Sequence, residues 1–226
     1  MSHLIDIFLQ PTKVFEALRE KPAFWLPLLL LAVFSAILPL WYFMVVDPEW
    51  FQQNLLLAAG NEMSAADMEK ARGAMPGTQA MGVIGAISSL VMVVVVSCLY
   101  ALYLMLAAKV TGAQLGFKRG LSLTSWSNMP ALLGMIVALA GVASMQPNTP
   151  LESLMLTNVD PLLVQLPVDS PWLGLARSFS LLNFWSWFLL ALGWRTMTNA
   201  GWLQSTVVAL LPSAVIYGVM ALFALT

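Results

Sequence analysis

The residues that could carry chemistry are few, and they are not grouped for catalysis. The single histidine, His3, lies at the amino terminus, and the single cysteine, Cys98, lies within an apolar run. Catalysis needs a nucleophile with a base, a pair of carboxylates or a bound metal. Every Asp and Glu falls outside the long apolar runs, and no His/Cys cluster is present. We therefore expect no catalytic residue, no metal site and no cofactor.

One apolar stretch nevertheless carries polar side chains on one face. Arg177, Ser180, Asn183 and Ser186 fall within about half of a helix circumference, at roughly 100° per residue. They could line a polar path for a solute or a lipid headgroup. Alternatively, Arg177 reaches the membrane surface while the serines bond their own backbone. We favour helix contact, because Ser and Asn commonly join helices in membranes.

A second group of candidates surrounds a basic pair. Phe117 can lie in the membrane interface while Lys118 and Arg119 meet anionic headgroups, each contributing about 1 kcal/mol near the surface. Pro130 begins the next apolar run, where its missing N–H costs nothing. With Trp126, these residues form the candidate site for lipids or partners. The alternative is that the basic pair only fixes the topology.

The composition requires that these residues be positioned by membrane helices. Sixty per cent of the 226 residues are apolar and nine per cent are charged, whereas a soluble domain carries about 25%. A bilayer admits long apolar runs only as helices of about 20 residues. We predict an all-α, polytopic membrane helix bundle that forms one domain over 1–226. Its five crossings are expected near 24–46, 81–108, 126–145, 172–194 and 204–225.

The segment before the first crossing, 1–23, is amphipathic. Leu4, Phe8, Phe15 and Leu18 fall on one helical face, and Pro11 divides the segment into two pieces. We predict that this face lies in the membrane interface. The alternative is a helix packed on the protein's own loops.

The connections predict short helices and turns. Asp47-Pro48-Glu49 is typical of a helix start, with an end at Gly60 and a second capped helix over 64–73. Five prolines in 146–171 permit one short helix at most, near 151–156. The Gly112–Gly116 stretch predicts a turn. Small residues such as Gly82 and Gly85 allow another helix to approach closely, either in this chain or in a second copy.

The charge distribution predicts orientation and partners. Seven of the ten Lys and Arg residues fall on the side of the amino terminus, which places that terminus in the cytoplasm and the carboxyl terminus outside. A net charge of −1 argues against a nucleic-acid partner. The expected partners are membrane lipids and other membrane proteins or a second copy.

Three motifs in order carry a family resemblance. A Pro-x-x-x-Phe-x-x-Leu pattern and a further Pro precede the first crossing; a glycine-rich turn, an aromatic, a basic pair and a later Pro follow the second; the fourth contains Trp-x-x-x-Leu-x-x-x-Gly and a basic residue. The matching residues are Pro11, Phe15, Leu18 and Pro22, then Gly112, Gly116, Phe117, Lys118, Arg119 and Pro130, and finally Trp185, Leu189, Gly193 and Arg195.

In these features the sequence resembles the Yip domain family, the Ypt/Rab-interacting membrane proteins and their bacterial relatives. The resemblance implies the same five-crossing plan. The long cytosolic amino segment of the eukaryotic members is missing, and Trp126 stands where they favour a Gly-Tyr pair. The resemblance therefore does not imply Rab binding, and a bacterial cytoplasmic (inner) membrane is expected.

Two functions remain open at this point. The first is a non-enzymatic scaffold or adaptor that binds lipids or membrane-protein partners. The second is a transporter of a small solute or a lipid, with a polar path along the fourth crossing. Flux of labelled lipid or solute in liposomes distinguishes them.

The predicted topology can be tested with reporter fusions. A fusion after Lys118 should report the cytoplasm, and a fusion after Asp160 should report the outer side, because the charge bias orients the crossings. Equal signals from both fusions would contradict this assignment.

Overall fold

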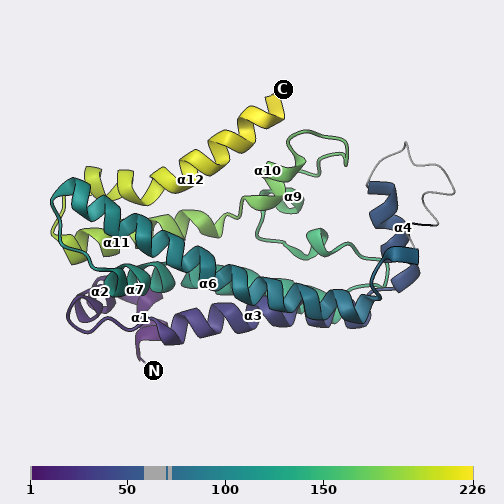
Figure 1. Cartoon of the computed structure of the whole chain (residues 1–226), viewed down its shortest axis with the longest axis horizontal. Helices are drawn as coiled ribbons and strands as arrows, with labels where there is room; N and C mark the ends of the chain where they lie inside the picture. The colour runs from purple at the N-terminus through teal and green to yellow at the C-terminus, as the bar shows by residue number, and fades with distance from the viewer. Residues whose placement is uncertain (1, 59–69, 71–72, 226) are drawn as a thin grey trace.

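The computed structural model is a bundle of helices (Figure 1) and describes residues 2–58, 70 and 73–225. Among these residues no strand is present beyond one isolated bridge between Asn158 and Ser180. The prediction of an all-α polytopic bundle is confirmed. Gly60, the expected end of the helix that follows Asp47, and most of the helix expected over 64–73 lie outside the described residues. The helices are α1 (Ser2–Leu9), α2 (Pro11–Glu20), α3 (Trp25–Val45), α4 (Pro48–Ala58), α6 (Thr78–Thr111), α7 (Phe117–Ser127), α8 (Met129–Ser144), the 3₁₀ helix η1 (Leu151–Leu154), α9 (Val159–Leu162), α10 (Leu173–Ser178), α11 (Leu182–Thr198) and α12 (Trp202–Leu225).

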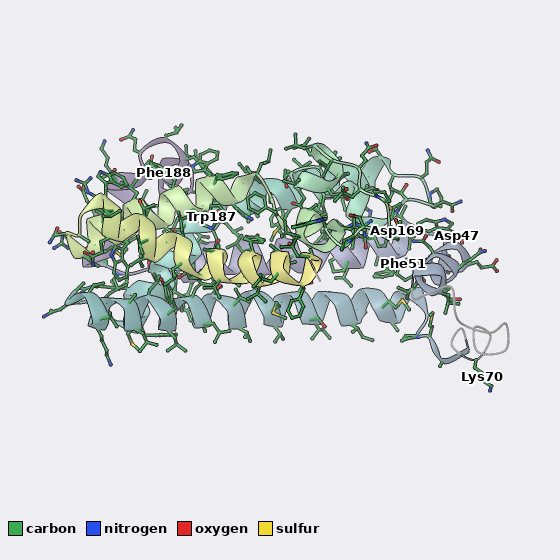
Figure 2. All side chains as sticks on the ribbon, turned by 90° about the horizontal axis from the view of Figure 1, so that it is seen from above. Asp47, Phe51, Lys70, Asp169, Trp187 and Phe188 are labelled. Carbon is green, nitrogen blue, oxygen red and sulfur yellow. The ribbon has the colours of Figure 1, made fainter. Side chains whose placement is uncertain are left out.

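The long helices run side by side in alternating directions. In Figure 1, α3, α7–α8 and α12 run from the end that holds α1 and α2, while α6 and α11 return to that end. Viewed from above, Asp47, Lys70 and Asp169 lie at the opposite end, beside α4 (Figure 2). Charged connections therefore lie beyond the apolar body of the bundle.

Three helices are long and apolar enough to cross a membrane: α3, α6 and α12. The pair α7 and α8 passes the same test together but is bent by 40° at Asn128, which makes up to four spans among the described residues. Large apolar side chains cover the outside; Met44, Val110 and Leu203 are 78%, 88% and 82% exposed. Such a surface is suited to lipid.

The fourth expected crossing, 172–194, differs in the structure. It is divided into α10 and α11, and the chain between them is not helical. The Ser180 hydroxyl donates to the Thr157 carbonyl over 3.1 Å, and the Leu181 N–H donates to the same carbonyl over 2.9 Å. These bonds join Ser180 and Leu181 to the preceding connection, so the chain does not continue as a helix between α10 and α11. Consequently α11 has 17 residues, fewer than the roughly 20 that a full crossing needs.

Close packing joins α6 to α3 within the chain. A Cβ atom added at Gly82 would lie 3.2 Å from Cβ of Phe43, and one at Gly85 would lie 3.0 Å from Cβ of Pro39. Small residues here let the backbones approach. The neighbour expected from the sequence therefore belongs to the same chain.

The amino-terminal helices pack on the protein itself. Phe15 and Leu18 in α2 are 0% and 1% exposed, and Leu4 and Phe8 pack against the same core. The prediction that this face lies in the membrane interface is therefore wrong for Phe15 and Leu18, whereas Leu4 and Phe8 are partly buried. Ile5 and Leu9 are 64% and 71% exposed, so the other side of α1 is the one open to the surroundings.

The short connections largely follow the sequence. The Trp50 N–H donates to Oδ1 of Asp47 over 2.8 Å, which confirms the predicted start of α4. Gly112 ends α6 with a left-handed φ of 74°, where glycine is favoured. In the proline-rich stretch, η1 covers Leu151–Leu154, two residues less than the expected 151–156. The expectation of one short helix at most in 146–171 is wrong, because α9 follows η1 in the same stretch.

Gly193 gives the most direct test of this packing. A Cβ atom at this position would collide with Leu123 of α7 and with the Phe15 ring, 2.8 Å from Cε1. Gly193→Ala should lower the free energy of unfolding by about 1–3 kcal/mol through overpacking, measured by denaturation in mixed micelles. The matched control is Gly218→Ala in α12, where nothing lies within 4 Å of the added atom. Unchanged stability of the Gly193 variant would show that α2 does not need this close approach.

Candidate functional site: a polar cavity inside the bundle

The bend between α7 and α8 brings irregular backbone into the bundle. Asn128 lies between the two helices and belongs to neither. At membrane depth, non-helical backbone is tolerated where it is buried in protein or lines a cavity. Ser127 and Asn128 both line such a cavity.

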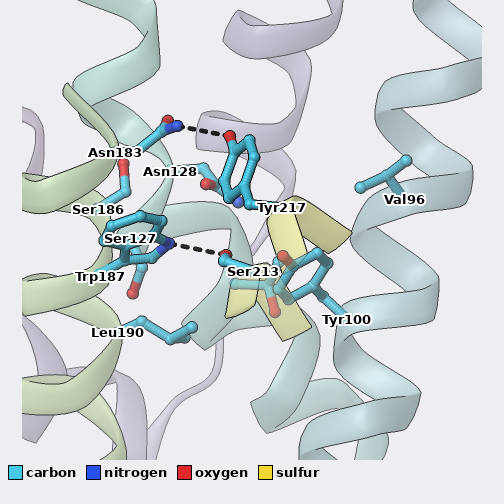
Figure 3. Close-up of a pocket in the computed structure, with 11 residues that line it drawn as sticks. Val96, Tyr100, Ser127, Asn128, Asn183, Ser186, Trp187, Leu190, Ser213 and Tyr217 are labelled. Atoms are coloured by element: carbon cyan, nitrogen blue, oxygen red, sulfur yellow. Dashed lines mark hydrogen bonds between the residues drawn. The ribbon is translucent and has the colours of Figure 1, made fainter. Parts of the chain in front are cut away.

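The cavity has a volume of about 210 Å³ and is bordered by α6, the α7–α8 bend, α11 and α12 (Figure 3). Thr124, Ser127 and Ser213, which line it, are 1%, 2% and 7% exposed, so the cavity reaches the buried interior of the bundle. Among the described residues, no charged side chain lines it. Its polar lining consists of the amides of Asn128 and Asn183 and the hydroxyls of Tyr100, Thr124, Ser127, Ser186, Ser213 and Tyr217.

Two side-chain hydrogen bonds join α11 to α12 across the cavity wall. Nδ2 of Asn183 donates to the Tyr217 hydroxyl over 2.9 Å, and Nε1 of Trp187 donates to the Ser213 hydroxyl over 2.8 Å (Figure 3). Asn183 thus makes a helix contact of the kind that the sequence analysis favoured, with Tyr217 of α12. The α12 backbone also bonds to α6: the Tyr103 hydroxyl donates to the Val208 carbonyl over 2.8 Å. Pro212, four residues later, has no N–H to bond that carbonyl.

The four polar residues of the expected fourth crossing do not form one continuous row. Asn183 and Ser186 line the cavity, whereas Ser180 bonds to Thr157. Arg177 forms an ion pair with Asp160, 3.5 Å from Nε to Oδ2. Asp160 belongs to the connection before α10, so Arg177 is joined to that connection and does not line the cavity.

The structure also separates the residues around the basic pair. Phe117 is 38% exposed, and Lys118 and Arg119 are exposed in the same first turn of α7. Trp126 is 2% exposed and donates from Nε1 to the Ala23 carbonyl over 2.7 Å. Pro130 is buried as well. The assignment of Trp126 and Pro130 as lipid-contacting residues is therefore wrong, because both lie in the interior.

The buried hydroxyls of α7 were not predicted from the sequence. Thr124 and Ser127 are 1% and 2% exposed, and neither hydroxyl has a hydrogen-bond partner in the described chain. The signal was available: 122–127 carries four hydroxyl residues just before Pro130. We interpreted that stretch as the edge of a crossing and did not expect it to lie inside the bundle.

Comparison with known proteins gives two matches. The Yip1 domain matches residues 5–223. The chain is 24% identical over 227 residues to the membrane protein YknW of Bacillus subtilis (strain 168), covering 98% of this chain and 88% of the relative. The source of this relative agrees with the bacterial membrane expected from the sequence. No solved structure matches.

The bond between Asn183 and Tyr217 should be measurable in a double-mutant cycle. Asn183→Leu and Tyr217→Phe should show a coupling of about 0.6 kcal/mol, the average for side-chain hydrogen bonds between membrane helices. The measurement is the free energy of unfolding in mixed micelles. Asn183→Leu combined with Tyr103→Phe is the control, and it should be additive within about 0.5 kcal/mol because these residues share no bond. Equal coupling in both cycles would contradict the specific contact.

Proposed function

Since the chain belongs to the Yip1 domain family, we propose that it is a non-enzymatic membrane adaptor that binds anionic lipid headgroups at the start of α7. The bound lipids, or the same surface directly, then recruit partner membrane proteins. The observation that carries this proposal is the exposed first turn of α7, whose side chains Phe117, Lys118 and Arg119 project from an otherwise buried helix.

The first turn of α7 has the chemistry of an anion site. Gly116 precedes the helix and provides no side-chain cap, so the first N–H groups are free to meet a phosphate. A helix amino terminus favours an anion through these groups and through its dipole. Lys118 and Arg119 add two positive charges, and within the described residues neither forms an ion pair.

The turn is held rigidly in place by the rest of the helix. A Cβ atom at Gly120 would lie 2.9 Å from the Ala101 carbonyl oxygen of α6, and Leu121 is 5% exposed. The Ser122 hydroxyl donates to the Ala23 carbonyl over 2.9 Å. The first turn of α7 therefore projects from a part of the helix that is packed against α6 and bonded to Ala23, just before α3.

Two arginines at this end, Arg19 and Arg195, have structural partners. Nη1 of Arg19 donates to the Thr196 carbonyl over 3.2 Å and to Oδ1 of Asn199 over 3.0 Å. The Arg195 guanidinium lies 4.8 Å from the centroid of the Trp202 ring, within the range of a cation–π interaction. These two residues stabilise the loop between α11 and α12. Lys118 and Arg119 differ from the exposed lysines at this end, such as Lys13 and Lys21, because they are adjacent and lie in the first turn of a helix.

The alternative function, a transporter with a polar path along the fourth crossing, has less support. It needs Arg177, Ser180, Asn183 and Ser186 along one route. Arg177 is bound to Asp160 and Ser180 to Thr157. Liposome flux that disappears in a folded Asn183→Leu variant would favour the transporter over the adaptor.

Replacing the basic pair tests the adaptor proposal. Lys118→Gln with Arg119→Gln should weaken binding of anionic lipid by about 2 kcal/mol at low salt, from roughly 1 kcal/mol per cation. The measurement is equilibrium binding of fluorescent phosphatidylglycerol to the purified protein in an uncharged detergent, with phosphatidylcholine as the reference lipid.

The matched control replaces Lys13 and Lys21, which are exposed near the same end, by Gln. This control removes the same net charge as the Lys118/Arg119 variant. If the first turn of α7 is the binding site, the control should weaken binding of anionic lipid less than that variant does. Raising the salt from about 0.01 M to about 0.1 M shortens the Debye length from roughly 30 to 10 Å. It should therefore reduce the difference in lipid binding between the wild type and the Lys118/Arg119 variant. Equal losses from both pairs would contradict a specific site.

A further inference from the structure

Two buried hydroxyls inside the cavity lack partners, while their neighbours in α7 have them. The Ser125 hydroxyl donates to the Leu121 carbonyl over 2.8 Å. The hydroxyls of Thr124 and Ser127 bond to nothing in the described chain, and both residues line the cavity. Leaving a buried polar group unsatisfied costs about 1–3 kcal/mol. These two hydroxyls therefore point to a polar occupant.

The occupant should be uncharged. Among the described residues, the cavity is lined by hydroxyls, amides and apolar groups, with no cation or anion. A phosphate placed there would have no counter-charge, and burying an unpaired charge is strongly unfavourable. Hydroxyl and amide groups both donate and accept hydrogen bonds. They match a ligand that carries a free hydroxyl and an ester carbonyl.

An apolar groove adjoins the cavity. It has a volume of about 480 Å³, lies between α6 and α12, and shares Val96 and Tyr100 with the cavity. Its other residues include Leu99 of α6 and Val215 of α12. The two helices are joined by the bond from the Tyr103 hydroxyl to the Val208 carbonyl, which Pro212 leaves without its helical N–H partner. From there α12 diverges from α6 toward the carboxyl terminus (Figure 1).

We infer that the cavity and the groove together bind a neutral glycerolipid with one free hydroxyl, of which diacylglycerol is the simplest example. Its glycerol group lies among Thr124, Ser127 and Asn128, and one acyl chain lies along the groove. The volume of 210 Å³ equals that of about seven waters at roughly 30 Å³ each, which is enough for the glycerol and its ester groups. This site is separate from the α7 turn and does not depend on the adaptor proposal.

The test uses the full chain in nanodiscs of phosphatidylcholine. The probe is a diacylglycerol with a photoreactive diazirine in one acyl chain, and its cross-links are mapped by mass spectrometry. Wild-type protein should give saturable cross-linking to α6 and α12 residues of the groove. Unlabelled diacylglycerol should compete, and phosphatidylglycerol should compete at least about tenfold less well, because a charged headgroup loses its hydration in the cavity.

Two pairs of variants separate the polar and apolar parts of the site. Thr124→Val with Ser127→Ala should weaken probe binding by about tenfold, because two hydrogen bonds to the ligand are lost. Ser125→Ala, in the same helix but bonded to Leu121, is the control and should bind as wild type does. Val215→Trp should block the groove, whereas Val219→Trp, which is also exposed on α12, should not.

Several results would overturn the inference. They are equal binding by the double variant and wild type, equal competition by phosphatidylglycerol, or cross-links scattered over the apolar surface. Non-saturable binding would show that the cavity holds water only. Thermal unfolding of each variant verifies its fold, and if the α7 double variant fails to fold, the comparison of the two Trp variants decides.

Discussion

The contact between Phe15 and Gly193 determines how one end of the molecule is assembled. Because Gly193 has no side chain, α2 and α7 both pack directly on α11, and Leu123 shares the same space. This contact brings α7 inward, so Trp126 reaches the Ala23 carbonyl just before α3 begins. Phe15, Leu18, Leu189 and Gly193, which carry the family resemblance, are thus largely packing residues. Their pattern reflects a shared way of closing the bundle and does not identify a ligand.

Hydrogen bonding inside the bundle follows from the lack of water in a bilayer core. Backbone and side-chain groups there must find partners within the protein. The Pro212 position illustrates this, since the carbonyl it leaves free accepts a bond from Tyr103 on another helix. Asn183 and Trp187 meet the same requirement through α12. Against this background, Thr124 and Ser127 stand out because their hydroxyls remain unmatched.

The sequence predicted features that depend on local pattern. Composition and run length predicted the all-α bundle, and the N-cap at Asp47 and the turn at Gly112 follow from local rules. Features that depend on distant residues were missed. An amphipathic helix has the same pattern whether it faces lipid or a protein core, so the burial of Phe15 was not predictable. The interruption near Ser180 depends on Thr157, 23 positions away, which no helical periodicity contains.

The separation of charge from neutral polarity explains why two distinct lipid sites can exist in one small bundle. Cations lie at the end of the bundle, where water and headgroups screen them and where the start of α7 adds its free N–H groups. Deeper in, a cation would need a buried counter-charge. Hydroxyls and amides avoid that requirement, so the interior can be polar while remaining neutral. In the two proposals, the depth of a ligand's polar group therefore decides which site it uses: a phosphate binds at the start of α7, whereas a hydroxyl close to the acyl chains binds near Ser127.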